Sequence, residues 1–325
     1  MGNSSGSRSV PESPFEEEPL DPFSDPVFEH STIGIQAEQM EALETAVVRS
    51  ERMSVPLMFE NVDPFANINA CSPEHIEKLA HILEIRGAQP RQTKMREACF
   101  NAAGFAKGMS ILEIGCGTGV VTRELARIAG RDGRVVGLDV SPGLLSYARD
   151  RSGPLPVEYV LGDAYNLDFP DQAFDASCSV TLFAHLDNLG AVVREMIRVT
   201  RQTVMLLDQD YQTLVFENSN TKLTRKILQH GADYNVLDGW CGRKLPGLLV
   251  QHGVRNVQCW PFVYSERDSQ SYLITIAERF AALATRDGVI DEDEARVWLQ
   301  ELYDRAADGT FFASLNYYFA FGSRG

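Results

Sequence analysis

The segment that most constrains this chain is Leu112–Gly119, in which an apolar run leads directly into three alternate glycines. The apolar run is typical of a buried strand, and Gly115, Gly117 and Gly119 allow the backbone to turn tightly against a ligand before a helix begins. A dinucleotide fingerprint would need a small third residue at position 120, where this chain has Val120. The interpretation as a dinucleotide-binding motif is therefore weakened. The glycines by themselves could also mark nothing more than a tight turn.

From Gly108 onward, short apolar runs alternate with helical stretches, which is typical of βαβ units around a parallel sheet. We expect strands at Ser110–Ile114, Arg134–Asp139, Val157–Leu161, Phe174–Ser179, Thr203–Asp208, Val257–Val263 and Tyr317–Phe321. Helices are expected at Val120–Ala129, Pro142–Asp150, Leu189–Thr200 and Leu245–His252. The predicted fold class is therefore α/β, with a doubly wound, mainly parallel sheet of seven strands in residues 108–325.

Two connections, residues 209–243 and 264–312, are longer than such a sheet needs. The second contains two helical patterns, Ser271–Ala284 and Glu292–Ala307, and so reads as a helical insertion. Both connections leave strands at the carboxyl edge of the sheet, where open α/β folds bind their ligands. We therefore expect them to act as lids.

The chain before Gly108 divides into two parts. Residues 1–33 are rich in Ser, Pro and Glu and predict a flexible, acidic tail. Residues 34–107 predict an N-terminal helical region, with helices at Gln36–Arg52, Ser72–Arg86 and Pro90–Ala103. The first of these helices would pack on the body of the protein or, as the alternative, on a second copy of the chain in a homo-oligomer.

Two acids stand where predicted strands end. Asp139 closes the strand that follows the glycines, at the place where a carboxylate can accept hydrogen bonds from both hydroxyls of a ribose. Asp163 follows the next strand and can accept a hydrogen bond from an adenine amino group. Each acid could instead be a cap or turn residue, but ligand-facing groups after three consecutive strands form a coherent nucleoside site.

The glycine loop and the two strand-end acids together resemble the motifs of a known protein family. The run Glu113–Gly119, the strand-end Asp139 and the segment Gly162–Ala164 resemble class I S-adenosylmethionine-dependent methyltransferases, in particular the UbiE/COQ5-like small-molecule branch. The resemblance implies a Rossmann-like methyltransferase fold in which the glycine loop holds the methionine moiety, Asp139 the ribose and Asp163 the adenine of S-adenosyl-L-methionine. The implied cofactor site comprises Glu113, Gly115, Cys116, Gly117, Gly119, Asp139, Val140, Asp163, Ala164 and Ser179.

Methyl transfer from a sulfonium is an in-line displacement, so the acceptor needs alignment and, in some reactions, loss of a proton. His185 could be the general base, or it could hydrogen-bond locally and orient its loop. Asp210 is the second catalytic candidate, although it could instead be a solvated or capping carboxylate. Substrate contacts are expected from Asp208, Tyr211 and Tyr264. The acceptor would be a small, hydrophobic or amphipathic metabolite methylated on carbon, nitrogen or oxygen.

Composition restricts the other partners. The formal net charge of −15 opposes nucleic-acid binding, and no apolar run reaches the length of a membrane span. The six cysteines are scattered, without the spacing of zinc ligands, so we expect no metal and a cytoplasmic protein with reduced thiols. Two alternatives remain open: a methyltransferase that acts on protein or RNA, and a non-catalytic cofactor-binding protein of the same fold.

Overall fold

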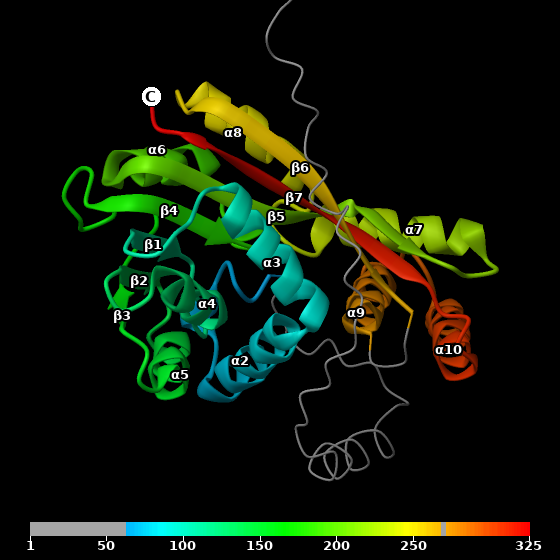
Figure 1. Ribbon diagram of the computed structural model, residues 1–325. Helices are drawn as coiled ribbons and strands as arrows, with labels where there is room; N and C mark the ends of the chain where they lie inside the picture. The colour runs from blue at the N-terminus through cyan, green and yellow to red at the C-terminus, as the bar shows by residue number, and fades with distance from the viewer. Residues whose placement is uncertain (1–62, 268–270) are drawn as a thin grey trace, which may run out of the picture. The chain divides into compact units, whose positions relative to one another are not determined.

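The computed structural model describes residues 63–267 and 271–325, whose strands form one seven-stranded sheet (Figure 1). The strand order is β3-β2-β1-β4-β5-β7-β6; β1 to β5 pair in parallel, whereas β7 runs antiparallel to both β5 and β6. The strands are β1 (Ser110–Ile114), β2 (Arg134–Asp139), β3 (Val157–Leu161), β4 (Phe174–Val180), β5 (Thr200–Phe216), β6 (Arg255–Glu266) and β7 (Ala313–Ser323). The predicted α/β class and mainly parallel sheet are confirmed.

Helices cover both faces of this sheet (Figure 1). They are α2 (Pro73–Ala88), α3 (Pro90–Ala102), α4 (Val120–Ala129), α5 (Pro142–Ser152), α6 (Leu189–Val199), α7 (Thr221–Tyr234), α8 (Leu245–Gln251), α9 (Tyr272–Arg286) and α10 (Glu292–Asp308). Helices α2 to α5 lie on one face, and α6 and α8 lie on the other. Helix α7 packs on β5 and on α9, which in turn contacts α10. Three short 3-10 turns complete the described elements: η1 (Ile68–Ala70), η2 (Phe183–His185) and η3 (Gly242–Lys244).

Local sequence explains where these helices begin. Ser72 caps α2 and Ser141 caps α5, in each case by accepting a hydrogen bond from a backbone N–H of the first turn, with proline at the first helical position. Asp291 and Glu294 form a capping box at the start of α10. None of the helices in the described ranges is both long and apolar enough to cross a bilayer.

Strand β1 lies at the centre of the core, with Ile111, Leu112 and Ile114 fully buried, because strands cover it on both edges and helices on both faces. A smaller apolar cluster joins α2 to α5 through Ile76, Leu79 and Leu144. The second predicted long connection contains two helices, α9 and α10, as expected. The acidic tail and the Gln36–Arg52 helix, with its proposed homo-oligomer contact, lie outside the described residues.

The prediction for the fifth strand was wrong at its carboxyl end. Strand β5 does not stop at Asp208 but continues to Phe216, so both Asp208 and Asp210 lie inside it. Its parallel neighbour β4 ends at Val180, but the antiparallel partner β7 continues the ladder, with Phe216 opposite Ala313. The first long connection therefore begins as sheet and then forms α7, which was not predicted.

Candidate functional site

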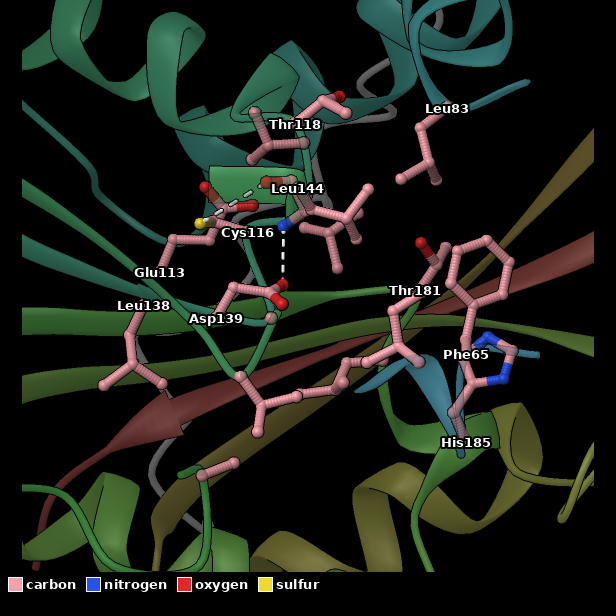
Figure 2. A pocket seen from close by; sticks show the side chains of 18 of the residues that line it. Phe65, Leu83, Glu113, Cys116, Thr118, Leu138, Asp139, Leu144, Thr181 and His185 are labelled. Carbon is pink, nitrogen blue, oxygen red and sulfur yellow. Dashed lines mark hydrogen bonds between the residues drawn. The ribbon is translucent and has the colours of Figure 1, made fainter. Parts of the chain in front are cut away.

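A cavity of about 390 Å³ lies at the carboxyl edge of the sheet, within the size range of small-molecule sites. One wall comes from the loops after β1, β2 and β3, and the opposite wall from α2, the segment before it and the turn after β4. Figure 2 shows Glu113 and Asp139 at one side and Phe65 with His185 at the other, with Thr181 between them. Its lining includes Glu113, Gly115, Cys116, Gly117, Asp139, Val140, Asp163, Ala164 and His185 from the predicted site.

The glycine loop turns sharply into this cavity. Gly115 and Gly117 both have positive φ angles, 75° and 53°, in the region that favours glycine. A Cβ atom on Gly115 would lie 2.8 Å from the side chain of Leu182, so a larger residue would collide there. The loop can therefore present its backbone directly to a ligand.

Asp139 fixes the loop in place. Its Oδ2 accepts a hydrogen bond from the backbone N–H of Gly117 at 2.8 Å, and its Oδ1 accepts one from Ser141 at 2.9 Å (Figure 2). Burial raises the pKa of this carboxyl group, and the backbone hydrogen bonds oppose that rise. Each carboxylate oxygen retains a second lone pair, which is the acceptor capacity that a ribose diol requires.

Asp163 lies at the exposed end of the same wall, where its Oδ1 accepts a hydrogen bond from the backbone N–H of Tyr165 at 2.9 Å. The side chain of Tyr165 also lines the cavity and donates its hydroxyl proton to Asp187 at 2.7 Å. An acid beside an aromatic ring at the cavity mouth can hydrogen-bond and stack a nucleobase.

Glu113 is buried beneath the glycine loop. Its carboxyl group accepts a hydrogen bond from the Thr122 hydroxyl, and burial raises its pKa to about 8. The neighbouring thiol of Cys116 is buried as well, and its pKa is raised far above its usual range, again by burial first. Burial therefore favours the neutral form of both groups.

His185 and Asp63 form a pair on the opposite wall. Nδ1 of His185 lies 2.9 Å from each carboxylate oxygen of Asp63, and the imidazole packs against the ring of Phe65. Asp63 also accepts hydrogen bonds from three backbone N–H groups, those of Phe65, Ala66 and Leu237. Burial raises the pKa of Asp63, but the contact with His185 and these hydrogen bonds outweigh it, so the pKa is lowered overall.

Six residues predicted for the site do not line the cavity. They are Gly119, Ser179, Asp208, Asp210, Tyr211 and Tyr264. Gly119 precedes α4 and faces the Tyr159 side chain, which lies too close for any Cβ atom. The buried hydroxyl of Ser179 has no hydrogen-bond partner in the described part of the chain.

The four acceptor-side residues have structural partners. Asp210 is fully buried and pairs with Arg243, whose Nη2 lies 2.9 Å from Oδ1. The carboxylate of Asp208 accepts a hydrogen bond from the backbone N–H of Ala184, and the hydroxyl of Tyr264 donates one to Glu266 at 2.5 Å. Tyr211 is buried beside Gln209. Asp208, Asp210 and Tyr211 are held by protein groups because β5 extends past the edge at which it was expected to end. Tyr264 lies on β6, which continues past its expected end at Val263.

The sequence analysis did not single out Asp63, Thr118 or Arg86, all of which line or directly support the cavity. Arg86 stands in the last turn of α2, where a basic residue ordinarily serves only the helix dipole. No local pattern marks Asp63 or Arg86, because their contacts join segments far apart in the chain. Thr118 lies inside the glycine loop.

Comparisons with known proteins agree with this geometry. A family described as a methyltransferase domain matches residues 111–203. A demethylmenaquinone methyltransferase of Bacillus licheniformis is 30% identical over 190 residues, which cover 52% of this chain and 80% of that protein. An uncharacterized 37.1 kDa protein in transposon TN4556 of Streptomyces fradiae is 29% identical, over 76% of this chain and 70% of that one.

Among solved structures, a methyltransferase-like protein from an antibiotic biosynthesis pathway of Anabaena variabilis superimposes with a TM-score of 0.52. The match covers 71% of this chain and 96% of that chain at 21% identity, so it supports the fold alone. Sheet order, glycine loop and strand-end acids define a nucleoside-cofactor enzyme of the methyltransferase class. This chain belongs to the class I S-adenosylmethionine-dependent methyltransferases, in the UbiE-like branch that includes the Bacillus enzyme.

The residues present fit S-adenosylmethionine. Thr118 lines the cavity, and its buried hydroxyl has no hydrogen-bond partner among the described residues. The positive-φ glycines leave the loop open to a ligand, and the carboxylates of Asp139 and Asp163 could accept hydrogen bonds from its hydroxyl and amino groups.

Proposed function

We propose that this enzyme methylates a small, hydrophobic or amphipathic metabolite, with Asp139, Asp163 and the glycine loop as the cofactor side of the site. The observation that carries the proposal is the single cavity that joins this wall to the wall formed by α2 and the turn after β4. S-adenosylmethionine supplies a sulfonium methyl group that is transferred by in-line displacement. The chain must therefore hold the acceptor in line and accept its proton where one is lost.

The wall formed by α2, the segment before it and the turn after β4, here called the acceptor wall, favours a hydrophobic methyl acceptor. Phe65, Leu83, Leu182 and Leu237 all line it, and apolar walls with a few polar groups are typical of small-molecule sites. The Bacillus relative is named for demethylmenaquinone, which supports an acceptor of this general character. The net charge of −15 disfavours RNA, the macromolecular alternative.

His185 is the proposed general base. The lowered pKa of Asp63 keeps its carboxylate ionised at neutral pH, and an ionised carboxylate favours the imidazole tautomer with its proton on Nδ1. Nε2 then has a free lone pair and can accept a proton from the acceptor's hydroxyl, amine or acidic carbon. Asp63 acts as a positioning residue, because it holds the ring and would stabilise the imidazolium that forms.

We also propose a cytoplasmic location. All six cysteines lie in the described part of the chain and all are free thiols, four of them buried. Unpaired thiols in this number are typical of reducing compartments.

A fractionation experiment tests the function. Enzyme and S-adenosylmethionine with a labelled methyl group are incubated with a cell extract divided into metabolites, proteins and RNA. We expect label in the metabolite fraction, with a gain of about 14 Da in one compound, and far less with an Asp139→Ala variant. Label confined to protein or RNA would overturn the small-molecule proposal. Cofactor binding with no label in any fraction would favour a non-catalytic binding protein.

A further inference from the structure

Arg86 presents a cation to the cavity from the last turn of α2. Its Nη2 donates a hydrogen bond to the hydroxyl of Thr181 at 2.9 Å. The side chains of Tyr272, Tyr317 and Tyr211 lie within electrostatic range of the guanidinium. Every one of these partners is a neutral hydroxyl group.

Two neighbouring arginines, by contrast, are each paired with a carboxylate. Arg96 forms a two-point ion pair with Glu124, at 2.7 and 2.6 Å, and Arg123 pairs with Glu84 at 2.9 Å. Within residues 63–267 and 271–325, Arg86 has no carboxylate within ion-pair distance. Removing an arginine from bulk water without a counter-ion lowers the stability of the fold. An anionic group of a ligand would therefore be favoured beside Arg86.

The hydroxyl groups around Arg86 come from the acceptor side of the molecule. Tyr272 begins α9, and Tyr317 lies on β7, where it accepts a hydrogen bond from the cavity-lining Gln92 at 3.0 Å. Neither tyrosine lines the cavity itself, and Tyr317 is fully buried. Thr181 follows β4 and has a φ of 55°, which is uncommon for a residue other than glycine and is enriched at functional sites.

We propose that Arg86, positioned by its hydrogen bond to Thr181 and flanked by Tyr272 and Tyr317, forms a subsite for an anionic oxygen group of the methyl acceptor, a carboxylate or an ionised phenol or enol. The planar guanidinium can donate hydrogen bonds to two oxygens of such a group at once. This proposal rests on the proposed methyltransferase function and narrows its substrate class to acidic metabolites. Arg86 would fix the acceptor beside Thr181, between the glycine loop and His185.

The competing source of the anion is the carboxylate of the cofactor's own methionine part. Calorimetry separates the two with S-adenosylhomocysteine and 5′-methylthioadenosine, which share the nucleoside but differ in the amino-acid carboxylate. For the acceptor subsite, we expect Arg86→Gln to leave the affinity for both compounds unchanged. A loss of at least tenfold for S-adenosylhomocysteine alone would assign Arg86 to the cofactor and overturn the proposal.

The acceptor arm uses the enzyme loaded with S-adenosylhomocysteine and two probes, benzoate and its neutral analogue benzamide, measured by ligand-observed NMR. Benzoate should bind the parent protein and lose about ten- to a hundredfold in affinity in Arg86→Gln, while benzamide binding changes little. Arg86→Lys should lose less, because it keeps the charge but not the fork. Arg296→Gln, which alters an exposed ion pair on α10, is the matched control.

The outcomes can be told apart. Equal benzoate binding by the parent and Arg86→Gln, or no benzoate binding by the parent, would overturn the subsite while leaving cofactor binding intact. Failure of the parent to bind S-adenosylhomocysteine would instead overturn the proposed function. If Arg86→Gln unfolds, Arg86→Lys provides the comparison, because it keeps the positive charge and removes the planar fork.

Discussion

The imidazole of His185 and the carboxylate of Asp63 meet at 2.9 Å across a separation of 122 residues in the chain. Asp63 also accepts a backbone hydrogen bond from Leu237, in the connection between α7 and α8. One carboxylate therefore joins the segment before α2, the turn after β4 and the loop after α7. Because all three segments border the cavity, the position of the proposed base depends on an acid that lies outside the cofactor motif.

We expect substitutions of the strand-end acids to weaken cofactor binding. Asp139→Asn removes a charged acceptor that holds the Gly117 N–H and would hold the ribose, so the affinity for S-adenosylhomocysteine should fall about ten- to a hundredfold. Asp163→Ala should also weaken binding. Asp150→Asn, an exposed change on α5, is the control. Unchanged calorimetric affinity in both site variants would remove these acids from the cofactor site.

Glu113 should make the protein less stable as the pH rises. Its pKa in the native state is about 8, against 4.5 for an unperturbed glutamate, so in this interval the native state binds the proton that the unfolded state has lost. The contribution of Glu113 to the free energy of unfolding then falls by about 1.4 kcal/mol per pH unit and levels off above the native pKa.

Glu113→Gln removes this dependence. The difference in unfolding free energy between Glu113→Gln and the parent should therefore shift in favour of the variant between pH 5 and pH 8, as measured by urea denaturation. Glu292→Gln, an exposed change at the start of α10, should follow the parent at both pH values. Parallel curves for parent and Glu113→Gln would contradict the raised pKa.

The wall of the cavity that carries the glycine loop could be predicted because its signals are local. Glycines directly after a strand, and acids at the ends of the next two strands, follow one another in a parallel sheet whose carboxyl ends share an edge. Each of β1, β2 and β3 was predicted with its correct bounds, since short apolar runs bounded by turns define them.

The acceptor wall could not be predicted, because it is made by distant segments. Arg86 meets Thr181 across 95 residues, and Asp63 meets His185 across a longer span. The length of β5 depends on its pairing with β7, more than a hundred residues later in the chain. Because the pairing with β7 could not be foreseen from the sequence, Asp208 and Asp210 were expected at the end of a strand. They lie instead inside the hydrogen-bonded pairing of β5 with β7.

Asp210→Asn should affect stability and not chemistry. The buried carboxylate pairs with Arg243, whose guanidinium stacks over the ring of Trp240 at 4.6 Å. Removing a hydrogen-bonded charge of this kind costs about 1.5 to 3 kcal/mol of unfolding free energy, with cofactor affinity unchanged. Asp293→Asn breaks an exposed pair with Arg296 and should cost less than about 1 kcal/mol. A parental melting temperature combined with lost turnover would return Asp210 to the catalytic candidates.

The pair of His185 and Asp63 gives the sharpest test of the chemistry. In His185→Asn, the side-chain amide can still donate a hydrogen bond to Asp63, but no ring nitrogen remains to accept a proton. With the acceptor found by fractionation, kcat should fall about a hundredfold or more if Nε2 is the base, while S-adenosylhomocysteine affinity stays at the parental value. Asp63→Asn keeps the ring but removes the charge that favours the Nδ1–H tautomer, so we expect a smaller loss in kcat and a changed dependence of kcat on pH. If His185→Asn turns over at the parental rate, the imidazole serves only to anchor the turn after β4 to the segment before α2, and proton removal must be assigned to solvent or to the acceptor itself.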